Sequence, residues 1–448
     1  MISMILFHLS NITTVSTDLL PNPKQKQHDL LVALFAALVC FCTYSIVYAF
    51  RKPFTVGTFS GITLWGIDYK VVLVIFQLIG YTSSKFYGIK FISEMQRFGR
   101  WKIVLLLVGF SWLALFFFAI VPTPFNVVFL FFNGFPLGIL WGIIFSYIEG
   151  RKATDFIGAA LAVSFIFASG FVKSVAKYLQ LQYAVTEFWL PFITGAFFIL
   201  PLLLFVFLME KIPPPSQNDI QLRNERKPMT KLERKNLFFQ FMPGLIVLII
   251  LYVFLTLFRD IRDNFAADMW NELGYSNKAS VFTQTETPIA VILLIVIASL
   301  VFIKNNFKAF VAAHCLIAVG FITTGFTTYL FMQHSINGFY WMLSVGLGLY
   351  LAYIPFNCLL FERMVAAFRW KANVGFLMYL SDSFGYLASI LVLFGKEIFS
   401  LKLNWVNFYT KGVVVFSLLG LLGTFISAFY FYTKYKKTNH LWKSAQQL

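Results

Sequence analysis

Apolar residues run along this chain in long stretches, and polar residues gather in the short connections between them. Each stretch is about as long as the roughly 20 residues that cross a bilayer as a helix. The short alternating segments of a membrane barrel do not occur, so the backbone hydrogen bonds must be made within helices. Twelve helical spans are predicted, at 30–55, 70–91, 102–121, 125–148, 156–179, 187–209, 240–262, 281–303, 308–332, 337–361, 373–397 and 409–433. The fold class is therefore an all-α polytopic membrane protein.

One long polar segment divides these spans into two sets of six. It contains Pro213, Pro214 and Pro215 among many charged residues, a composition typical of a linker rather than of a membrane span. The predicted organisation is a tail at 1–29, a six-helix bundle at 30–210, a linker at 211–238, a second bundle at 239–433 and a basic tail at 434–448.

Composition and charge agree with a membrane protein. Of 448 residues 59% are hydrophobic and 12% are charged, whereas soluble domains carry about 25% charged residues. The net charge of +17 comes from Lys and Arg in alternate loops, with no nucleic-acid-binding motif around them. Because positive residues mark cytoplasmic loops, both termini are predicted to be cytoplasmic. The four cysteines lie in apolar stretches and the five histidines are scattered, so no metal, cofactor or enzymatic motif is recognised.

Two arginines occupy equivalent places in the two predicted bundles. The first span ends with Tyr44, Tyr48 and Phe50 before Arg51, and the seventh ends with Tyr252 and Phe258 before Arg259. In both, a Tyr lies seven residues before the Arg and a Phe directly before it. This short match fits parallel halves related by an axis along the membrane normal.

A charged residue within a membrane span costs roughly 2.5–3.5 kcal/mol at the helix centre, so it needs a compensating role. One interpretation of Arg51 and Arg259 is that they extend to the lipid headgroups. The other is that they face a shared central cavity, where the planar guanidinium groups bind phosphate or carboxylate. Lys85, Lys173, Glu286 and Asp382 are candidates for substrate contact, gating or structural ion pairs.

The Asp-Ile-Arg-Asp segment after Arg259 has a simpler interpretation. Asp260, Arg262 and Asp263 are expected to neutralise one another locally. An alternative uses Asp260 and Asp263 as the carboxylates of a membrane-embedded transferase.

With these residues in place, the chain resembles the major facilitator superfamily, and within it the organophosphate:phosphate antiporters. The resemblance is carried by Arg51 and Lys52 after a Tyr-rich run, the Ser-Lys-Phe at 84–86, Arg259, Glu286 before Pro288, and the Phe-Gly-Tyr-Leu at 384–387. It extends from about residue 35 to residue 433. It implies that Arg51 and Arg259 hold a phosphate between the halves, and that the protein alternates its access and exchanges substrate for phosphate.

The resemblance has two departures and one altered motif. The antiporters place a His in the fifth span, where this chain has none and has Lys173 slightly further on, and Asp382 is unexpected beside a phosphate. The superfamily motif after the second span survives in altered form as Glu94, Arg97 and Arg100, for which the resemblance implies ion-pair contacts between helices.

The prediction is a monomeric secondary transporter of a small phosphorylated or carboxylated anion, in the lipid bilayer of the bacterial inner membrane. Predicted substrate-binding residues are Arg51, Arg259, Tyr48, Lys85, Tyr44 and Tyr252, and predicted gating or coupling residues are Glu286, Asp382, Lys173, Glu94, Arg97 and Arg100. The alternatives are a proton-coupled carrier of a neutral solute, in which Glu286 or Asp382 titrates, a transporter-like sensor, and the transferase.

Overall fold

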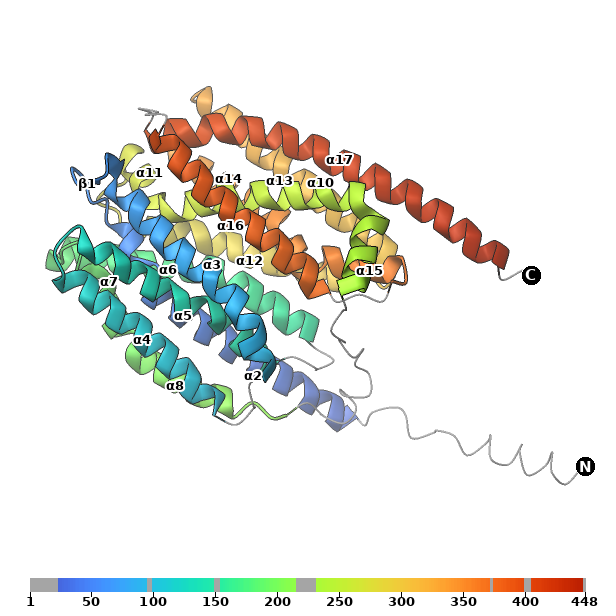
Figure 1. Cartoon of the computed structure of the whole chain (residues 1–448), viewed down its shortest axis with the longest axis horizontal. Coiled ribbons are helices and arrows are strands. Elements are labelled where there is room, and N and C mark those ends of the chain that lie inside the picture. The colour runs from blue at the N-terminus through green and yellow to red at the C-terminus, as the bar shows by residue number, and fades with distance from the viewer. Residues whose placement is uncertain are drawn as a thin grey trace, which may run out of the picture.

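The computed structural model describes residues 23–94, 99–148, 154–214, 231–370, 374–398 and 404–445, nearly all of them in helices. The helices up to residue 210 lie on one side of the molecule and the helices from residue 231 on the other (Figure 1). The first set comprises α2 (Pro23–Val47), α3 (Tyr69–Glu94), α4 (Arg100–Ile120), α5 (Val128–Phe145), α6 (Thr154–Tyr183), α7 (Leu190–Phe197) and α8 (Ile199–Glu210).

The second set follows the same order of long helices, with two short connecting helices. It comprises α10 (Lys231–Asn264), α11 (Ala266–Glu272), α12 (Val281–Val301), α13 (Asn306–Met332), α14 (Gly338–Cys358), α15 (Leu360–Ala367), α16 (Val374–Ile398) and α17 (Trp405–Ala445). Helices of the two sets pack on one another: α6 packs along α12 and also contacts α14, and α3 packs against α16.

Among the described residues, nine helices are long and apolar enough to cross a membrane, and the bent pair of α7 and α8 makes a tenth span. The pair bends by 49°, close to Pro201, which cannot donate a hydrogen bond to the preceding turn. Helices α3 and α16 have 26 and 25 residues and contain charged residues, among them Lys85 and Asp382. At 1.5 Å per residue each exceeds the roughly 30 Å hydrocarbon core, so twelve helical segments correspond to the twelve predicted ones. The predicted all-α polytopic fold is confirmed.

Side-chain burial separates the lipid-facing surface from the interior. Helix α4 exposes large apolar side chains at regular intervals, including Leu106, Phe110, Leu113 and Phe117. Helix α14 is largely buried among its neighbours. This distribution is the one expected when lipid, rather than water, surrounds the protein.

The first predicted span continues too far as a regular helix. The prediction continued a regular span to residue 55, whereas α2 ends at Val47 and two 3-10 turns, η1 (Tyr48–Phe50) and η2 (Pro53–Val56), follow. Pro53 favours this change, because a proline has no backbone N–H to donate to the preceding turn of a helix. Arg51 and Lys52 therefore lie in the turn between η1 and η2.

Three small elements were not predicted: α11, α15 and a hairpin of β1 (Thr63–Leu64) and β2 (Ile67–Asp68), which pairs antiparallel with Thr63 opposite Asp68. A third 3-10 turn, η3 (Phe125–Val127), precedes α5. An apolar hollow of about 630 Å³ lies beside the hairpin and η3 and has no charged lining residue. The charged residues of interest lie elsewhere.

Candidate functional site

Polar side chains of α3 and α5 hold the turn that presents Arg51. Gln77 on α3 donates from its Nε2 to the Arg51 carbonyl at 3.0 Å and to Asn133 Oδ1 at 2.8 Å. Asn133 on α5 donates from its Nδ2 to the Phe50 carbonyl at 2.8 Å. These bonds use backbone carbonyls that the interrupted helix leaves without intrahelical partners. Two neighbouring helices therefore fix the Arg51 backbone.

The Arg51 side chain is buried, and none of the described carboxylates forms an ion pair with it. Only 8% of the residue is exposed, and its guanidinium carbon lies 3.9 Å from the ring centre of Tyr81 and 5.9 Å from that of Tyr48. Its Nε has no hydrogen-bond partner, and in the part of the chain that the structure describes no ion pair includes it. Tyr44 packs edge-on against Tyr48 at 5.5 Å. Burying a charge without an ionic partner is costly, and in the described structure the rings of Tyr81 and Tyr48 lie against the Arg51 charge.

Arg259 lies on α10 and is already paired. Its Nε and Nη2 donate to Asp260 Oδ1 at 3.2 and 2.7 Å, and its guanidinium carbon lies 4.4 Å from the ring centre of Tyr353. The other oxygen of Asp260 accepts a hydrogen bond from Ser389 on α16 at 3.0 Å. The two arginines thus occupy similar aromatic surroundings but differ in charge compensation.

Another ion pair, unlike the one within α10, joins the two sets of helices. Lys85 on α3 pairs with Asp382 Oδ2 on α16, and the Tyr252 hydroxyl donates to Asp382 Oδ1. The side chains of Lys85 and Asp382 are 18% and 19% exposed. Lys85 also lies 5.2 Å from the Tyr81 ring centre and 4.8 Å from that of Tyr386.

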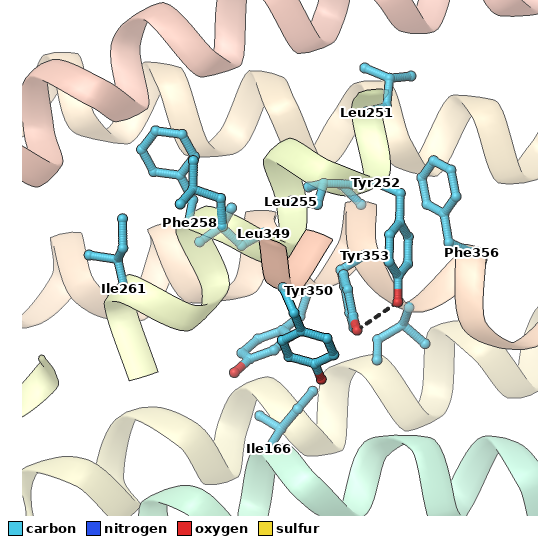
Figure 2. Close-up of a cluster of buried hydrophobic side chains, with 14 of the residues drawn as sticks. Ile166, Leu251, Tyr252, Leu255, Phe258, Ile261, Leu349, Tyr350, Tyr353 and Phe356 are labelled. Carbon is cyan, nitrogen blue, oxygen red and sulfur yellow. Dashed lines mark hydrogen bonds between the residues drawn. The ribbon is translucent and has the colours of Figure 1, made fainter. Parts of the chain in front are cut away.

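Tyrosine rings complete the connection between these charged groups. Tyr81 and Tyr386 pack edge to face at 5.6 Å, and the hydroxyls of Tyr252 and Tyr353 lie 3.0 Å apart, as the dashed line in Figure 2 shows. Successive contacts therefore lead from one arginine to the other through four helices. We call this set the tyrosine path: Arg51, Tyr81, Tyr386, Lys85, Asp382, Tyr252, Tyr353, Arg259 and its partner Asp260.

A separate group of charges surrounds Asp263, near the end of α10. Asp263 Oδ2 pairs with Lys52 at 2.5 Å and Oδ1 with Lys173 at 2.5 Å, and Ser169 donates to the same Oδ1. Lys52 also donates to Asn264 Oδ1 at 2.7 Å. We call these five residues the Asp263 cluster, which joins the turn after α2 and helix α6 to α10.

The expectation that Asp260, Arg262 and Asp263 neutralise one another is wrong. Asp260 binds Arg259, Asp263 binds the two lysines, and Arg262 reaches Glu286 on α12 at 2.7 Å. Arg262 and Asp263 point about 100° apart on α10, so Arg262 meets α12 whereas Asp263 meets the lysines of α6 and of the turn after α2. Both acids that a transferase would use are engaged in ion pairs. Lys173, near the place where the antiporters have a His, binds Asp263.

The motif after the second span is only partly described. Arg97 lies outside the described residues, and of Glu94 the structure describes the backbone at the end of α3 but not the side chain. Arg100, at the start of α4, donates to the Ser146 carbonyl at 3.1 Å and to its hydroxyl at 2.9 Å. The predicted role of this motif in gating stays a prediction.

Sequence reasoning missed Tyr81, Tyr353 and Tyr386 as members of the site. Two of them carried a usable signal: Tyr81 precedes Lys85 by four residues, and Tyr386 follows Asp382 by four, so each shares a helix face with a charged residue. Sequence reasoning also missed the pair of Lys70 with Asp268 at 2.5 Å, which joins α3 to α11.

The close packing of α6 on α12 can be tested at Gly170. A Cβ there would lie 2.6 Å from the Glu286 Cβ and 2.8 Å from the Phe282 carbonyl oxygen. Gly170→Ala should therefore force the two helices apart and lower stability by about 1–3 kcal/mol. Thermal unfolding in detergent measures this, with Gly109→Ala as the control, since nothing lies within 4 Å of its added Cβ. A variant at Gly170 as stable as that control would show that this contact is not tight.

Comparison with solved structures identifies the fold. The D-xylose–proton symporter superimposes with a TM-score of 0.58 at 17% identity over 89% of this chain and 96% of its own. An inward-facing bacterial homologue of the human lysosomal transporter Spinster gives 0.55 at 14% identity over 91% and 98%. The human organic anion transporter MFSD10 gives 0.53 at 14% identity over 91% and 100%.

These similarities show the fold alone, which is that of the major facilitator superfamily with its all-helical, multi-pass architecture. Comparison with curated protein sequences found no significant match. A family model does match, over residues 53–434. That match begins two residues after Arg51 and includes the rest of the tyrosine path. The chain therefore belongs to the family of unknown function DUF5690.

Proposed function

We propose that this protein is a secondary active transporter of a small anionic metabolite, phosphorylated or carboxylated, which binds at the tyrosine path. The observation that carries the proposal is the buried Arg51 guanidinium, which has no carboxylate partner among the residues that the structure describes. The fold supports the transport part of the proposal, since the structural neighbours described above are transporters.

An anion satisfies what the Arg51 site lacks. A guanidinium group offers several donors in one plane, which suits the paired oxygens of carboxylate and phosphate. Tyr81 covers one face of the Arg51 group, so the anion is expected at its edge. Lys85 and Arg259 lie further along the tyrosine path, one on each set of helices, and each is paired with a carboxylate.

The arrangement of helices suits alternating access. The α6–α12 and α3–α16 contacts are the surfaces along which the two sets of helices would move. The Asp263 cluster and the Lys70–Asp268 pair tie the sets together near the ends of α2 and α10. In the proposed mechanism these pairs break when that side opens and form again when the anion is released on the other side.

Resemblance to the organophosphate:phosphate antiporters adds a proposal about exchange. The Arg51, Lys85 and Glu286 positions match that family's pattern, and they support exchange of an organic anion against phosphate. In the proposed orientation the protein lies in the bacterial inner membrane with both termini in the cytoplasm. An impermeant thiol reagent applied outside the cell should then label the Trp65→Cys variant in the exposed hairpin. Labelling only from the cytoplasmic side would show that the orientation is the reverse of the proposed one.

Proteoliposomes loaded with inorganic phosphate test the proposal. We expect saturable uptake of a labelled phosphorylated or carboxylated metabolite, faster with phosphate inside than with chloride inside. A neutral sugar should not be taken up under the same conditions. Binding of the anion without uptake would instead indicate a sensor.

A proton-coupled carrier of a neutral solute is the main rival. That function needs Glu286 or Asp382 to change protonation during the cycle, and here both carboxylates lie in ion pairs, with Arg262 and Lys85. Uptake of a neutral solute that follows the pH gradient and does not depend on Arg51 would favour this rival over the anion carrier.

A further inference from the structure

The tyrosine path contains more positive side chains than negative ones. It holds three cations, Arg51, Lys85 and Arg259, and two carboxylates, Asp260 and Asp382. Each carboxylate uses both oxygens: Asp260 accepts from Arg259 and Ser389, and Asp382 accepts from Lys85 and Tyr252. One positive charge is left over, and it belongs to Arg51.

We propose that Asp382 is a built-in counter-ion for Lys85 that restricts the substrate to one net negative charge, as in a monocarboxylate or a phosphodiester. This inference rests on the proposed function and narrows its substrate class. A singly charged anion beside Arg51 makes the tyrosine path neutral. A doubly charged anion needs a second free cation, and Asp382 already pairs with Lys85, the cation that shares the Tyr81 ring with Arg51.

The burial of this site makes the difference in charge matter. Two charges about 4 Å apart interact far more strongly near protein than in water, by enough to change binding more than tenfold. The second charge of a dianion would meet Asp382 as a like charge instead of meeting a free Lys85. The site is therefore expected to discriminate by charge as well as by shape.

The position of Asp382 allows the charge to be removed with little change in shape. In Asp382→Asn the amide oxygen can still accept the Tyr252 hydroxyl, while the ionic partner of Lys85 is lost. The same pair also joins α3 to α16, so a purely mechanical role between the two sets of helices must be distinguished. Such a role would alter the transport of every anion by the same factor.

A matched pair of probes tests the proposal: a phosphate monoester and its methyl diester, at pH 8. The monoester carries two negative charges there, because its second pKa is near 6, whereas the diester carries one. In competition for uptake, the wild type should prefer the diester. Asp382→Asn should shift the monoester-to-diester ratio at least about tenfold toward the monoester.

The charge-restoring variant gives the sharpest comparison. Lys85→Met with Asp382→Asn has the same net charge as the wild type and should return the preference to the diester, whereas Lys85→Met alone should weaken uptake of both. The ratio of monoester to diester uptake is measured within one protein preparation. The fraction of active protein affects both probes equally and therefore does not change this ratio.

The possible results separate the two proposals. An unchanged ratio in Asp382→Asn, or an equal change for both probes, overturns the role of Asp382 while an Arg51-dependent uptake leaves the anion carrier standing. Wild-type preference for the monoester also overturns the inference. If the wild type takes up neither probe nor any other anion, the proposed function fails and the inference fails with it.

Discussion

Arg51→Lys is expected to lower anion uptake by about 100-fold although it keeps the positive charge. The guanidinium lies 3.9 Å from the Tyr81 ring centre, and its plane can offer two parallel hydrogen bonds to one anion. A lysine ammonium is a point charge without that planar fork. Loss of one or two charge-assisted hydrogen bonds, at roughly 1.5–3 kcal/mol each, accounts for the expected loss. Initial rates at low substrate concentration, which report kcat/KM, measure it.

Arg363→Lys provides a matched control on α15. Arg363 also uses its guanidinium, donating to Asn306 Oδ1 at 2.7 Å, but it lies outside the tyrosine path. We expect the Arg363→Lys protein to take up the anion at a rate close to that of the wild type. Wild-type uptake in Arg51→Lys would remove the main support for an anion site at this position.

Asp263→Asn should be the most destabilising single change in the Asp263 cluster. It leaves Lys52 and Lys173, whose side chains are 5% and 4% exposed, without their shared carboxylate. Breaking a buried ion pair from one side costs roughly 3–5 kcal/mol, because the remaining charge stays buried. Thermal unfolding in detergent should therefore occur at a clearly lower temperature than in the wild type.

A second substitution tests the physical reason. Adding Lys173→Met to Asp263→Asn removes one of the two stranded charges, and Lys52 keeps the Asn264 oxygen at 2.7 Å. The double variant should recover at least half of the lost stability, a coupling that a double-mutant cycle measures. An Asp263→Asn protein as stable as the wild type, or a double variant less stable than both single ones, would contradict this account of the cluster.

Most of the fold could be predicted because it depends on local pattern. The apolar stretches predicted the helices, since only helices and closed barrels satisfy the backbone in lipid. The turn after α2 could not be placed in this way, because it depends on Pro53 and on bonds from Gln77 and Asn133. Short connecting elements such as α11 and α15 also lack a distinctive pattern.

The sequence predicts several residues of the site, but not which of these residues form ion pairs with one another. Intramembrane charge alone singles out Arg51, Lys85, Arg259 and Asp382, because such residues are expensive in lipid. Lys85 and Asp382, however, are 297 residues apart in the sequence, and no local pattern joins them. Arg259 has its partner Asp260 next to it in the sequence, whereas the aromatic surroundings of Arg51 depend on which helices meet.

Stabilisation of the purified protein by anions tests the central claim most directly. Thermal unfolding would be followed with inorganic phosphate and with a phosphodiester, against chloride at equal ionic strength, in the wild type and in Arg51→Met. At about 100 times its dissociation constant, a bound anion should stabilise the wild type by about 2.7 kcal/mol and leave Arg51→Met unchanged. Equal stabilisation of the two proteins, or none in the wild type with any anion tried, would contradict the claim that the charge on Arg51 is balanced by a bound substrate.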